Sequence, residues 1–581
     1  MVGEEMGLST VMMIILFGTN LMLFGVFWYL DRQSSNKPAQ EENEGHKVMS
    51  KPFKATFECN YNLSKELVVT GGIMALTFVC ERYPYFEHSM KHYDRDLFGF
   101  IVLLFFIYAW YTRKPTKDLS LLSRDQTEEW KGWMQFIFLL YHYFHAEEVY
   151  NSVRCMITCY VWMTGFGNFS FFYFKQDYGW LRVVQMLWRL NFSVMLLMFW
   201  HGNTYILYYI CPLHTFYFLL TYCIMAIGKQ YNHDKWGMRV KIFAAVVLIY
   251  LLWDVNGGVF DYVFGFLGTS PVIGANSGTV WEWYFRTSLD KYSTIFGIIF
   301  ASNYPLCEQF FVEAAKKDRK PLMASAVVVG GIALWWLFCV YPMEKMEYNL
   351  THNYFAFIPL LAYIFFRNIT PSIRSVISMS LHTLGKTTLE TYLLQHHIWL
   401  TSNAKTLLTI IPNNPVLNFA FASMLFYVCS RELYRLTMSL RGMMLPEDAS
   451  IALSNLKLMG KVFAVLLVEA GVVRVVGLRF GGALAMIGLN YYLFVEKSGS
   501  IPHFYGLGQD VRDLPKFAIF KKHAKTTAFI LLGAGILCIL CGTDSVAAKK
   551  YTAVRSADRH SSLQTSTLPL PFIMAQRKRP E

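Results

Sequence analysis

A lysine and a histidine in one apolar segment have the types and spacing that acyl transfer requires. In the run WKGWMQFIFLLYHYFH, residues 130–145, Lys131 precedes His142 by eleven residues. On an α-helix this spacing separates them by ~20° around the axis and by ~16 Å along it. The cation could hold a nucleotide phosphate while the imidazole meets a thioester at the end of a pantetheine arm. The pattern indicates acyl transfer from acyl-CoA, although it also fits a snorkelling lysine above a hydrogen-bonded core histidine.

Two further pairs of polar residues stand in or beside apolar segments, where each member costs free energy unless it is paired or faces a cavity. Arg286 and Asp290 are four residues apart in EWYFRTSLDKY, a spacing that predicts a structural ion pair on a helix. Glu390 and His397 are seven apart in LGKTTLETYLLQHHIWL, which predicts a carboxylate on the helical face of an imidazole. Both pairs could serve catalysis or only fix the packing of helices.

Three more polar residues belong to this group of candidates. Arg182 and Arg189 are seven residues apart, so they share one face of a predicted helix. His352 stands just ahead of the apolar run that ends at Arg367. A bundle that needed only stability could replace such buried ionic groups with apolar side chains at little cost, so their number favours a function.

The composition predicts an all-α membrane protein. Of 581 residues, 54% are hydrophobic, 17% aromatic and only 16% charged, which is too apolar for an ordinary soluble domain. Apolar runs recur along the chain without the alternating polarity of an outer-membrane barrel. Because several are shorter than the ~20 residues that span a bilayer, we expect a polytopic helical bundle with roughly 13 to 15 transmembrane helices.

The basic side chains predict the orientation of this bundle. The net charge of +13 is concentrated in loops and at the chain ends, where it suits anionic lipid headgroups rather than nucleic acid. By the positive-inside rule, residues 31–65 and the basic loop 113–131 face the cytosol. Lys131 would then face cytosolic acyl-CoA.

Composition also divides the chain into four segments. We expect an anchor helix and polar linker over residues 1–65, a multi-span acyltransferase-like domain over 66–435, additional membrane helices over 436–548, and a basic disordered tail over 549–581. The eleven cysteines lie mostly in apolar runs and are interpreted as small core residues. No histidine stands near them at ligand spacing, so no metal site and no permanently bound cofactor are expected.

Several long motifs resemble one protein family. They are RDQTEEWKGWMQFIFLLYHYF, YVWMTGFGNFSFFYFKQDYG, WRLNF, YYICPLHT, EWYFRTSLDKY and LGKTTLETYLLQHHIWL. Together, over roughly residues 90 to 435, they are similar to the plant reduced wall acetylation proteins, which are relatives of the fungal capsule O-acetyltransferase and the animal sialic acid O-acetyltransferase. The KGWMQFIFLLYH segment also resembles the motif of bacterial acyltransferase family 3, in which a basic residue precedes a histidine by a ten-residue gap.

This resemblance implies a polytopic Golgi membrane protein that O-acetylates cell-wall or other polysaccharides with acetyl-CoA as donor. It places family histidines on His142, His352 and His397, whereas His145 and His396 are additions in this chain. Asn353 stands where the family has proline, and Lys291 where it has arginine. The fungal and animal relatives carry an added lumenal hydrolase-like domain. We expect none here, so the chain is similar to the plant form, which works with separate lumenal acetyltransferases.

The expected mechanism assigns roles to these residues. His142 acts as general base, or as a nucleophile that accepts acetyl, and Lys131 binds acetyl-CoA. Arg182 and Arg189 are further candidates for donor binding. A second polar cluster, with His352 and His397 as candidate catalytic residues and Glu390 orienting His397, receives the acetyl group or the acceptor hydroxyl.

Two other functions fit the same sequence. The chain could be an acetyl or acetyl-CoA transporter, in which the polar residues line a path and partner enzymes perform the chemistry. It could also be a scaffold that assembles lumenal acetyltransferases and has no donor site. The expected partners are acetyl-CoA, a polysaccharide acceptor and membrane lipids. Separate lumenal acetyltransferases are further expected partners, above all if the chain is a transporter or a scaffold.

Overall fold

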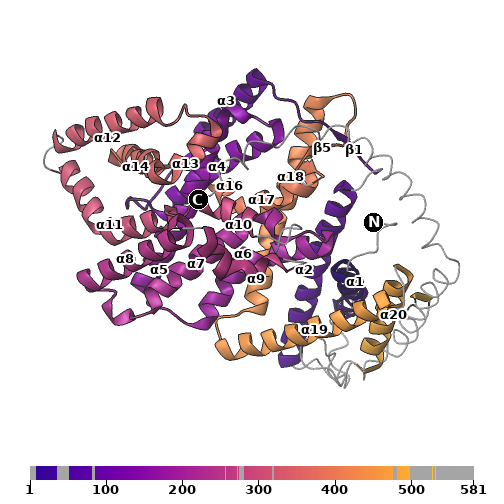
Figure 1. The fold of residues 1–581 in the computed structure, drawn as a ribbon. Coiled ribbons are helices and arrows are strands. Elements are labelled where there is room, and N and C mark those ends of the chain that lie inside the picture. Colours follow the sequence, from indigo (N-terminus) through magenta and orange to yellow (C-terminus); the bar gives the residue numbers. More distant parts are fainter. Residues whose placement is uncertain are drawn as a thin grey trace, which may run out of the picture. The chain divides into compact units, whose positions relative to one another are not determined.

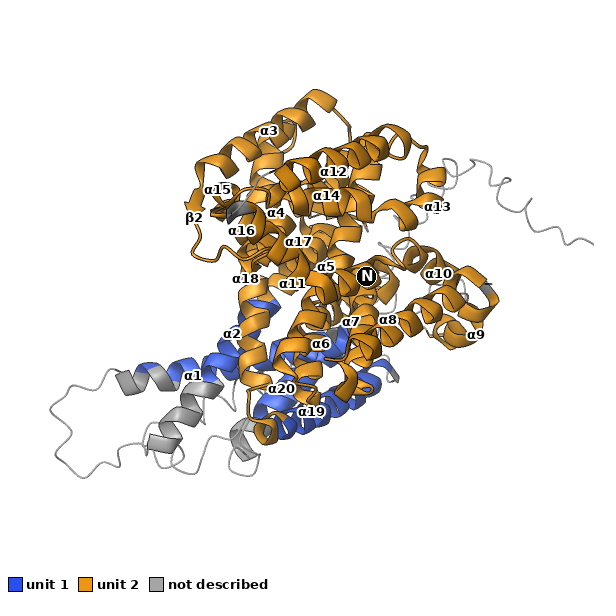
Figure 2. Cartoon of the chain, turned by 90° about the vertical axis from the view of Figure 1, so that its left-hand side faces the viewer, with its two compact units in different colours: residues 1–71, 453–581 blue, residues 72–452 orange. Residues whose placement is uncertain are grey.

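The described residues fall into two compact units. The structure, a computed structural model, describes residues 8–35, 51–81, 85–255, 257–270, 273, 280–316, 320–402, 404–475, 480–497, 527, 530 and 531. Residues 1–71 and 453–581 belong to one unit and residues 72–452 to the other (Figure 2). Most of the predicted linker, most of the last predicted helix and the whole predicted tail lie outside the described residues.

The first unit joins the two ends of the chain. Its described part consists of α1 (Leu8–Ser35), the beginning of α2 (Lys51–Glu81), most of α19 (Ala449–Val475) and α20 (Phe480–Lys497). The Asn20 amide donates to the Ser64 carbonyl oxygen over 3.0 Å and links α1 to α2. Gly18 allows α1 to approach Ile487 of α20, because a methyl group there would overlap that side chain. The sequence places these helices in separate segments, whereas in the structure they share one unit.

The second unit, residues 72–452, is almost entirely helical (Figure 1). After the end of α2, its first half contains α3 (Arg95–Tyr111), α4 (Arg124–Phe144), η2 (Glu147–Val149), α5 (Tyr150–Lys175), α6 (Trp180–His201), η3 (Tyr205–Tyr208), α7 (Ile210–Ala226), η4 (Lys229–Tyr231), α8 (Lys235–Tyr250), the π-helix η5 (Leu251–Val255) and α9 (Gly257–Gly268). Its second half contains α10 (Trp281–Ser288), α11 (Ser293–Lys316), α12 (Lys320–Cys339), α13 (Lys345–Phe355), α14 (Phe357–Arg367), α15 (Pro371–Arg374), α16 (Met379–Lys386), α17 (Thr388–Leu394), the π-helix η6 (Gln395–Trp399) and α18 (Pro415–Met444).

Two small antiparallel sheets connect distant parts of this unit. Strand β5 (Thr406–Thr409) pairs with β1 (Glu87–Ser89) on one side and with β4 (Leu400–Thr401) on the other. Strand β2 (Arg113–Pro115) pairs with β3 (Val376–Ser378), with Lys114 opposite Ile377. Since β3 leads directly into α16, the second sheet places α16 next to α4.

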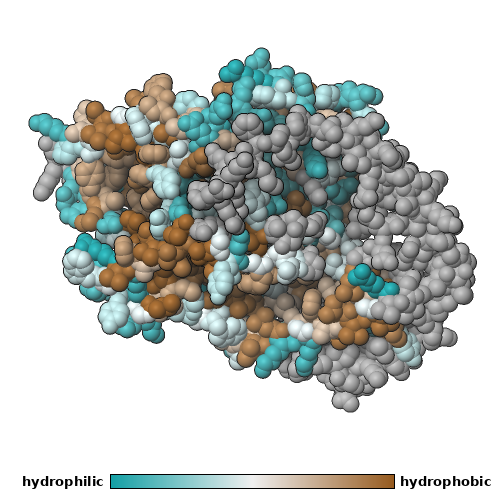
Figure 3. Space-filling model, in the orientation of Figure 1, coloured by the Kyte–Doolittle hydropathy of each residue, from teal (hydrophilic) through white to brown (hydrophobic). Residues whose placement is uncertain are grey.

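Long apolar helices with exposed apolar side chains support a membrane location. Among the described residues, six helices are long and apolar enough to cross a bilayer, or seven if the bent pair formed by α8 with η5 and α9 counts as one span. Exposed apolar side chains lie along α12 and α8, as with Val327, Phe338 and Phe243. Figure 3 shows hydrophobic patches on the face turned to the viewer. Such surfaces suit lipid rather than water. The predicted count of 13 to 15 spans is not confirmed by the described helices.

Two reciprocal glycine contacts hold the centre of the second unit together. A methyl group on Gly132 of α4 would overlap the carbonyl oxygen of Leu381 in α16, and one on Gly385 of α16 would overlap the carbonyl oxygen of Glu128 in α4. The backbones of the two helices therefore touch at two points. Small residues permit this close approach in membrane helices, where packing rather than the hydrophobic effect drives association.

A second pair of reciprocal glycine contacts joins α5 to α11. A methyl group on Gly165 would overlap the carbonyl oxygen of Thr294, and one on Gly297 would overlap that of Trp162. In both pairs, each helix supplies one glycine and one carbonyl group. The two contacts fix α4 and α5 against later parts of the chain, and both helices carry residues of the candidate site.

Replacing Gly132 with alanine should force α4 and α16 apart, because its methyl group meets backbone rather than a flexible side chain. We expect Gly132→Ala to lower the free energy of unfolding by about 1–3 kcal/mol or more, the usual cost of overpacking. Thermal unfolding of the purified protein in detergent measures this. Gly442→Ala in α18 is the matched control, since a methyl group there meets nothing within 4 Å. Equal melting temperatures for the two variants would contradict the proposed close contact.

Candidate functional site

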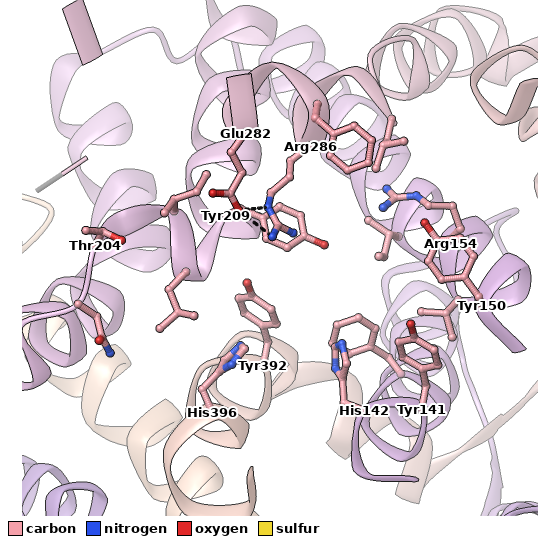
Figure 4. Close-up of a pocket in the computed structure, with 18 of the residues that line it drawn as sticks. Tyr141, His142, Tyr150, Arg154, Thr204, Tyr209, Glu282, Arg286, Tyr392 and His396 are labelled. Carbon is pink, nitrogen blue, oxygen red and sulfur yellow. Dashed lines mark hydrogen bonds and ion pairs between the residues drawn. The ribbon is translucent and has the colours of Figure 1, made fainter. Parts of the chain in front are cut away.

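A cavity of about 640 Å³ lies within the second unit. Its walls come from α4, α5, the segment 202–209 between α6 and α7, α10, α17 and η6. Figure 4 shows imidazole and phenol groups along one wall and guanidinium groups opposite them. This arrangement brings together residues that are more than 250 positions apart in the sequence.

His142 lies on the wall that carries the imidazole groups, and one of its ring nitrogens has a hydrogen-bond partner. Its Nδ1 lies 3.2 Å from Oε1 of Gln395, the first residue of η6. Because an amide oxygen only accepts, this contact selects the tautomer in which Nδ1 carries the proton and Nε2 keeps its lone pair. Lys91, in the loop before α3, donates to the His142 carbonyl oxygen over 2.7 Å. Burial lowers the pKa of Lys91 to about 8.

His396 follows Gln395 and lines the same cavity. Its side chain is 8% exposed, and neither ring nitrogen has a hydrogen-bond partner among the described residues. The Tyr392 ring packs edge-on against it, with the ring centroids 5.5 Å apart. His396 is thus a buried imidazole whose hydrogen-bonding capacity is unused within the described part of the chain.

Charged side chains form the opposite wall. Arg286 of α10 donates from Nε and Nη2 to Glu282 Oε1, over 3.0 and 2.9 Å. Its guanidinium group lies 4.5 Å from the centre of the Tyr209 ring. Arg154 of α5 also lines the cavity and pairs with buried Asp290. Its Nε is buried and has no hydrogen-bond partner among the described residues.

The predicted ion pair between Arg286 and Asp290 is wrong. Arg286 binds Glu282, and Asp290 accepts hydrogen bonds from Arg154 and from Thr158, the latter over 2.7 Å. The reason is that α10 ends at Ser288, so Asp290 lies in the following turn and not one helical turn beyond Arg286. Glu282 stands one turn before Arg286 on the same helix and is therefore the acid that Arg286 reaches.

His352 lies in the cluster around Asp290. Its Nε2 is 2.6 Å from the Thr158 hydroxyl and 3.9 Å from Asp290 Oδ1. Nδ1 has no hydrogen-bond partner in the described part of the chain. His352 is therefore connected to the cavity through Asp290 and Arg154, and its catalytic role stays a prediction.

His397 occupies a separate polar cluster. Its Nε2 lies 2.5 Å from the Tyr208 hydroxyl, its Nδ1 lies 3.5 Å from Glu81 Oε2, and its ring stacks on His201 with the centroids 4.1 Å apart. The predicted orientation of His397 by Glu390 is wrong. Glu390 instead forms a two-point ion pair with Arg189.

The π-helix explains this second correction. A spacing of seven residues places two side chains on one face only if the α-helix continues between them. Here α17 ends at Leu394 and the chain enters η6, whose wider turns rotate the following residues. Gln395, His396 and His397 consequently reach His142, the cavity and the Tyr208 cluster, respectively.

Lys131 shares α4 with His142 as predicted, but packed side chains separate the two. Its ammonium group forms an ion pair with Glu128 over 2.8 Å, and Lys131 is not among the described residues that line the cavity. The face between them carries Gln135, which contacts the Tyr160 hydroxyl at 3.3 Å. Tyr160 also donates to the Lys131 carbonyl oxygen. Donor binding by Lys131 stays a prediction.

The two candidate arginines of α6 have protein partners. Arg189 binds Glu390 through both of its terminal nitrogens, with distances of 2.5 and 3.1 Å. The Arg182 guanidinium carbon lies 3.9 Å from the centre of the Phe171 ring. Their assignment to donor binding also stays a prediction.

Sequence reasoning missed several residues that line the cavity or contact His142. Arg154, Tyr392 and Gln395 were not candidates, and His396 was treated only as an addition beside the family histidine. Arg154 gave a usable signal, because it is a lone arginine inside the apolar run of α5. The orientations of Gln395 and His396 depend on η6, which no local pattern in the sequence indicates. Among the described residues, no cluster of three or more potential metal ligands occurs.

Comparison with known proteins now identifies the class. Residues 4–457 match the family described as "10 TM Acyl Transferase domain found in Cas1p". The chain belongs to this family of polytopic membrane acyltransferases, which confirms the predicted all-α membrane fold. The match includes the N-terminal helix that the sequence analysis treats as a separate anchor.

One curated relative is an animal enzyme. The chain is 32% identical over 403 residues to the N-acetylneuraminate (7)9-O-acetyltransferase of Danio rerio. The aligned region covers 66% of this chain and 51% of that protein, so the chain spans about half the length of the relative. No solved structure matches. The finer resemblance to the plant reduced wall acetylation proteins stays a prediction.

The Arg189–Glu390 ion pair should contribute mainly to stability. We expect Glu390→Gln to lower the free energy of unfolding by about 3 kcal/mol, because it leaves Arg189 beside a buried uncharged amide. The double variant Arg189→Met/Glu390→Leu should recover much of this loss, since neither charge remains. Thermal unfolding in detergent measures both effects. A double variant as unstable as the single variant would show that Glu390 does more than neutralise Arg189.

Proposed function

We propose that this protein is a membrane-embedded O-acetyltransferase that moves acetyl from cytosolic acetyl-CoA to polysaccharide hydroxyl groups in the Golgi lumen. The observation that carries the proposal is His142: its Nδ1 is held by Gln395, and its ring lines a cavity opposite two guanidinium groups. Membership of an acyltransferase family and similarity to a protein named as an O-acetyltransferase support the reaction class. The acetyl-CoA donor, the polysaccharide acceptor and the Golgi location come from the motif resemblance.

The cavity contains the groups that a direct transfer needs. The acceptor hydroxyl oxygen attacks the thioester carbonyl carbon while His142 Nε2 takes the hydroxyl proton. Negative charge then develops on the carbonyl oxygen, which a guanidinium N–H of Arg154 would stabilise. When the carbon–sulfur bond breaks, the CoA thiolate receives the proton from the imidazolium. The products are the acetyl ester and free CoA, and the histidine returns to its starting form.

Replacing His142 should abolish acetyl transfer. We expect His142→Ala to lower the rate at least 100-fold, as loss of a general base usually does, while membrane insertion is kept. The assay follows transfer from radiolabelled acetyl-CoA to xylan, pectin, glucomannan or N-acetylneuraminate by purified protein in detergent. His92→Ala, at an exposed loop position, is the control. Full activity of His142→Ala would remove the assignment of His142.

The same assay tests the proposed enzyme against a transporter. An enzyme transfers acetyl in detergent without a sealed vesicle, whereas a transporter needs the vesicle. If the wild-type protein neither transfers acetyl nor releases CoA in detergent, yet carries acetyl into sealed vesicles, the proposed activity is wrong. If it does not bind acetyl-CoA at all, a scaffold is favoured.

Gln395 should act through His142. We expect Gln395→Leu to lower the transfer rate by about 10–100-fold, the range seen when a group that orients an imidazole is lost. Because the proton on Nδ1 loses its partner, the pH dependence of the rate should shift as well. Gln395→Glu keeps an acceptor at this position and should retain more activity than leucine. Equal rates for the leucine variant and the wild type would contradict the positioning role.

A further inference from the structure

Four rings form a continuous strip along one wall of the cavity. The ring centroids of His142 and Phe138 are 4.4 Å apart, those of Phe138 and Tyr392 are 6.3 Å apart, and those of Tyr392 and His396 are 5.5 Å apart. All four residues line the cavity. We call this set the ring strip. It has the proposed base at one end, two benzenoid rings in the middle and a second imidazole at the other end. Figure 4 labels three of its members, His142, Tyr392 and His396.

The second imidazole is the unusual member. His396 is more than nine-tenths buried, and both of its nitrogens are without a hydrogen-bond partner among the described residues. A buried polar atom that lacks a partner costs about 1–3 kcal/mol, so its retention calls for a ligand that supplies the missing bonds. Packing gives no such reason, because a phenylalanine could fill the same space against Tyr392 and Tyr208.

The chemistry of the strip selects one kind of ligand. A sugar ring has an apolar C–H face that can pack on the Phe138 and Tyr392 rings, and hydroxyl groups around its edge. A neutral imidazole has one donor and one acceptor, and a hydroxyl group can satisfy either. The charged groups stand on the opposite wall, where they suit the developing charge of the thioester.

We propose that the ring strip is the acceptor subsite, in which a sugar ring packs on Phe138 and Tyr392 and one of its hydroxyl groups hydrogen-bonds to His396. This inference rests on the proposed function for the role of the ligand as acceptor. The sugar then spans the strip, so that a different hydroxyl group lies at His142 and receives the acetyl group. His396 is an acceptor-binding residue that decides which hydroxyl group reaches the base.

The test measures sugar binding apart from catalysis. Xylobiose, mannobiose and galacturonobiose are titrated into the full-length protein in detergent, and the Kd of the disaccharide that binds best is compared among variants. We expect His396→Phe to raise this Kd about tenfold, the usual effect of one lost hydrogen bond. His396→Gln keeps a donor and an acceptor and should raise it less. His92→Phe should leave it unchanged.

Deoxy analogues of the same disaccharide provide a test that needs no folded variant. One analogue, lacking the hydroxyl group that His396 binds, should bind the wild type about tenfold more weakly. That analogue should show no further loss with His396→Phe, since both changes remove the same bond. In transfer assays, His396→Phe should raise KM for the sugar and leave KM for acetyl-CoA unchanged.

The outcomes separate this inference from the proposed function. Binding of a disaccharide that depends on His396, without any acetyl transfer, would support the subsite and overturn the enzyme. Transfer that is equally efficient in His396→Phe and wild type would overturn the subsite and leave the enzyme intact. Failure of all three disaccharides to bind the wild type, or equal Kd values for wild type and His396→Phe, would likewise overturn the subsite.

Discussion

The close contact between α4 and α16 is the constraint on which the candidate site depends. Gly132 and Gly385 let the two backbones touch, and each glycine faces a carbonyl group of the other helix. Ten residues after Gly132, α4 carries His142, and ten residues after Gly385 the chain reaches Gln395. Along the chain, only α17 separates this contact on α16 from Gln395, whose hydrogen bond selects the tautomer of His142. The two glycines do not line the cavity, and they affect the candidate site by fixing the positions of α4 and α16.

Three successive residues of the π-helix η6 lie in three different environments. This helix follows α17 directly, and its residues Gln395, His396 and His397 reach His142, the cavity and the Tyr208–Glu81 cluster, respectively. An ordinary α-helical turn would set successive side chains about 100° apart, so the register would differ. π-helical turns occur mostly as single-turn insertions in α-helices, and they are frequent at functional sites.

Sequence reasoning predicts the class of fold and one histidine that lines the cavity, but not the partners of the charged residues. The Lys131–His142 spacing correctly predicts one helix, since an apolar run of that length has few alternatives. It does not show that Gln135 and Tyr160 fill the face between the two residues, because Tyr160 comes from α5. The Arg286–Asp290 prediction fails at a helix end, and the Glu390–His397 prediction fails at a change of helix type. Long-range packing decides both outcomes.

The pairing of charges indicates which side chains are left to meet a ligand. Within the described part of the second unit, the two arginines that line the cavity each have a carboxylate partner, Asp290 for Arg154 and Glu282 for Arg286. A paired cation adds little net charge to the cavity, although its remaining N–H groups can still donate. The imidazoles of His142 and His396, together with the Tyr392 hydroxyl group, therefore carry hydrogen-bonding capacity on the opposite wall. Such a wall favours an uncharged hydroxyl-bearing ligand over an ionic one, because burial of an unpaired charge costs far more than burial of a hydrogen-bonded hydroxyl group.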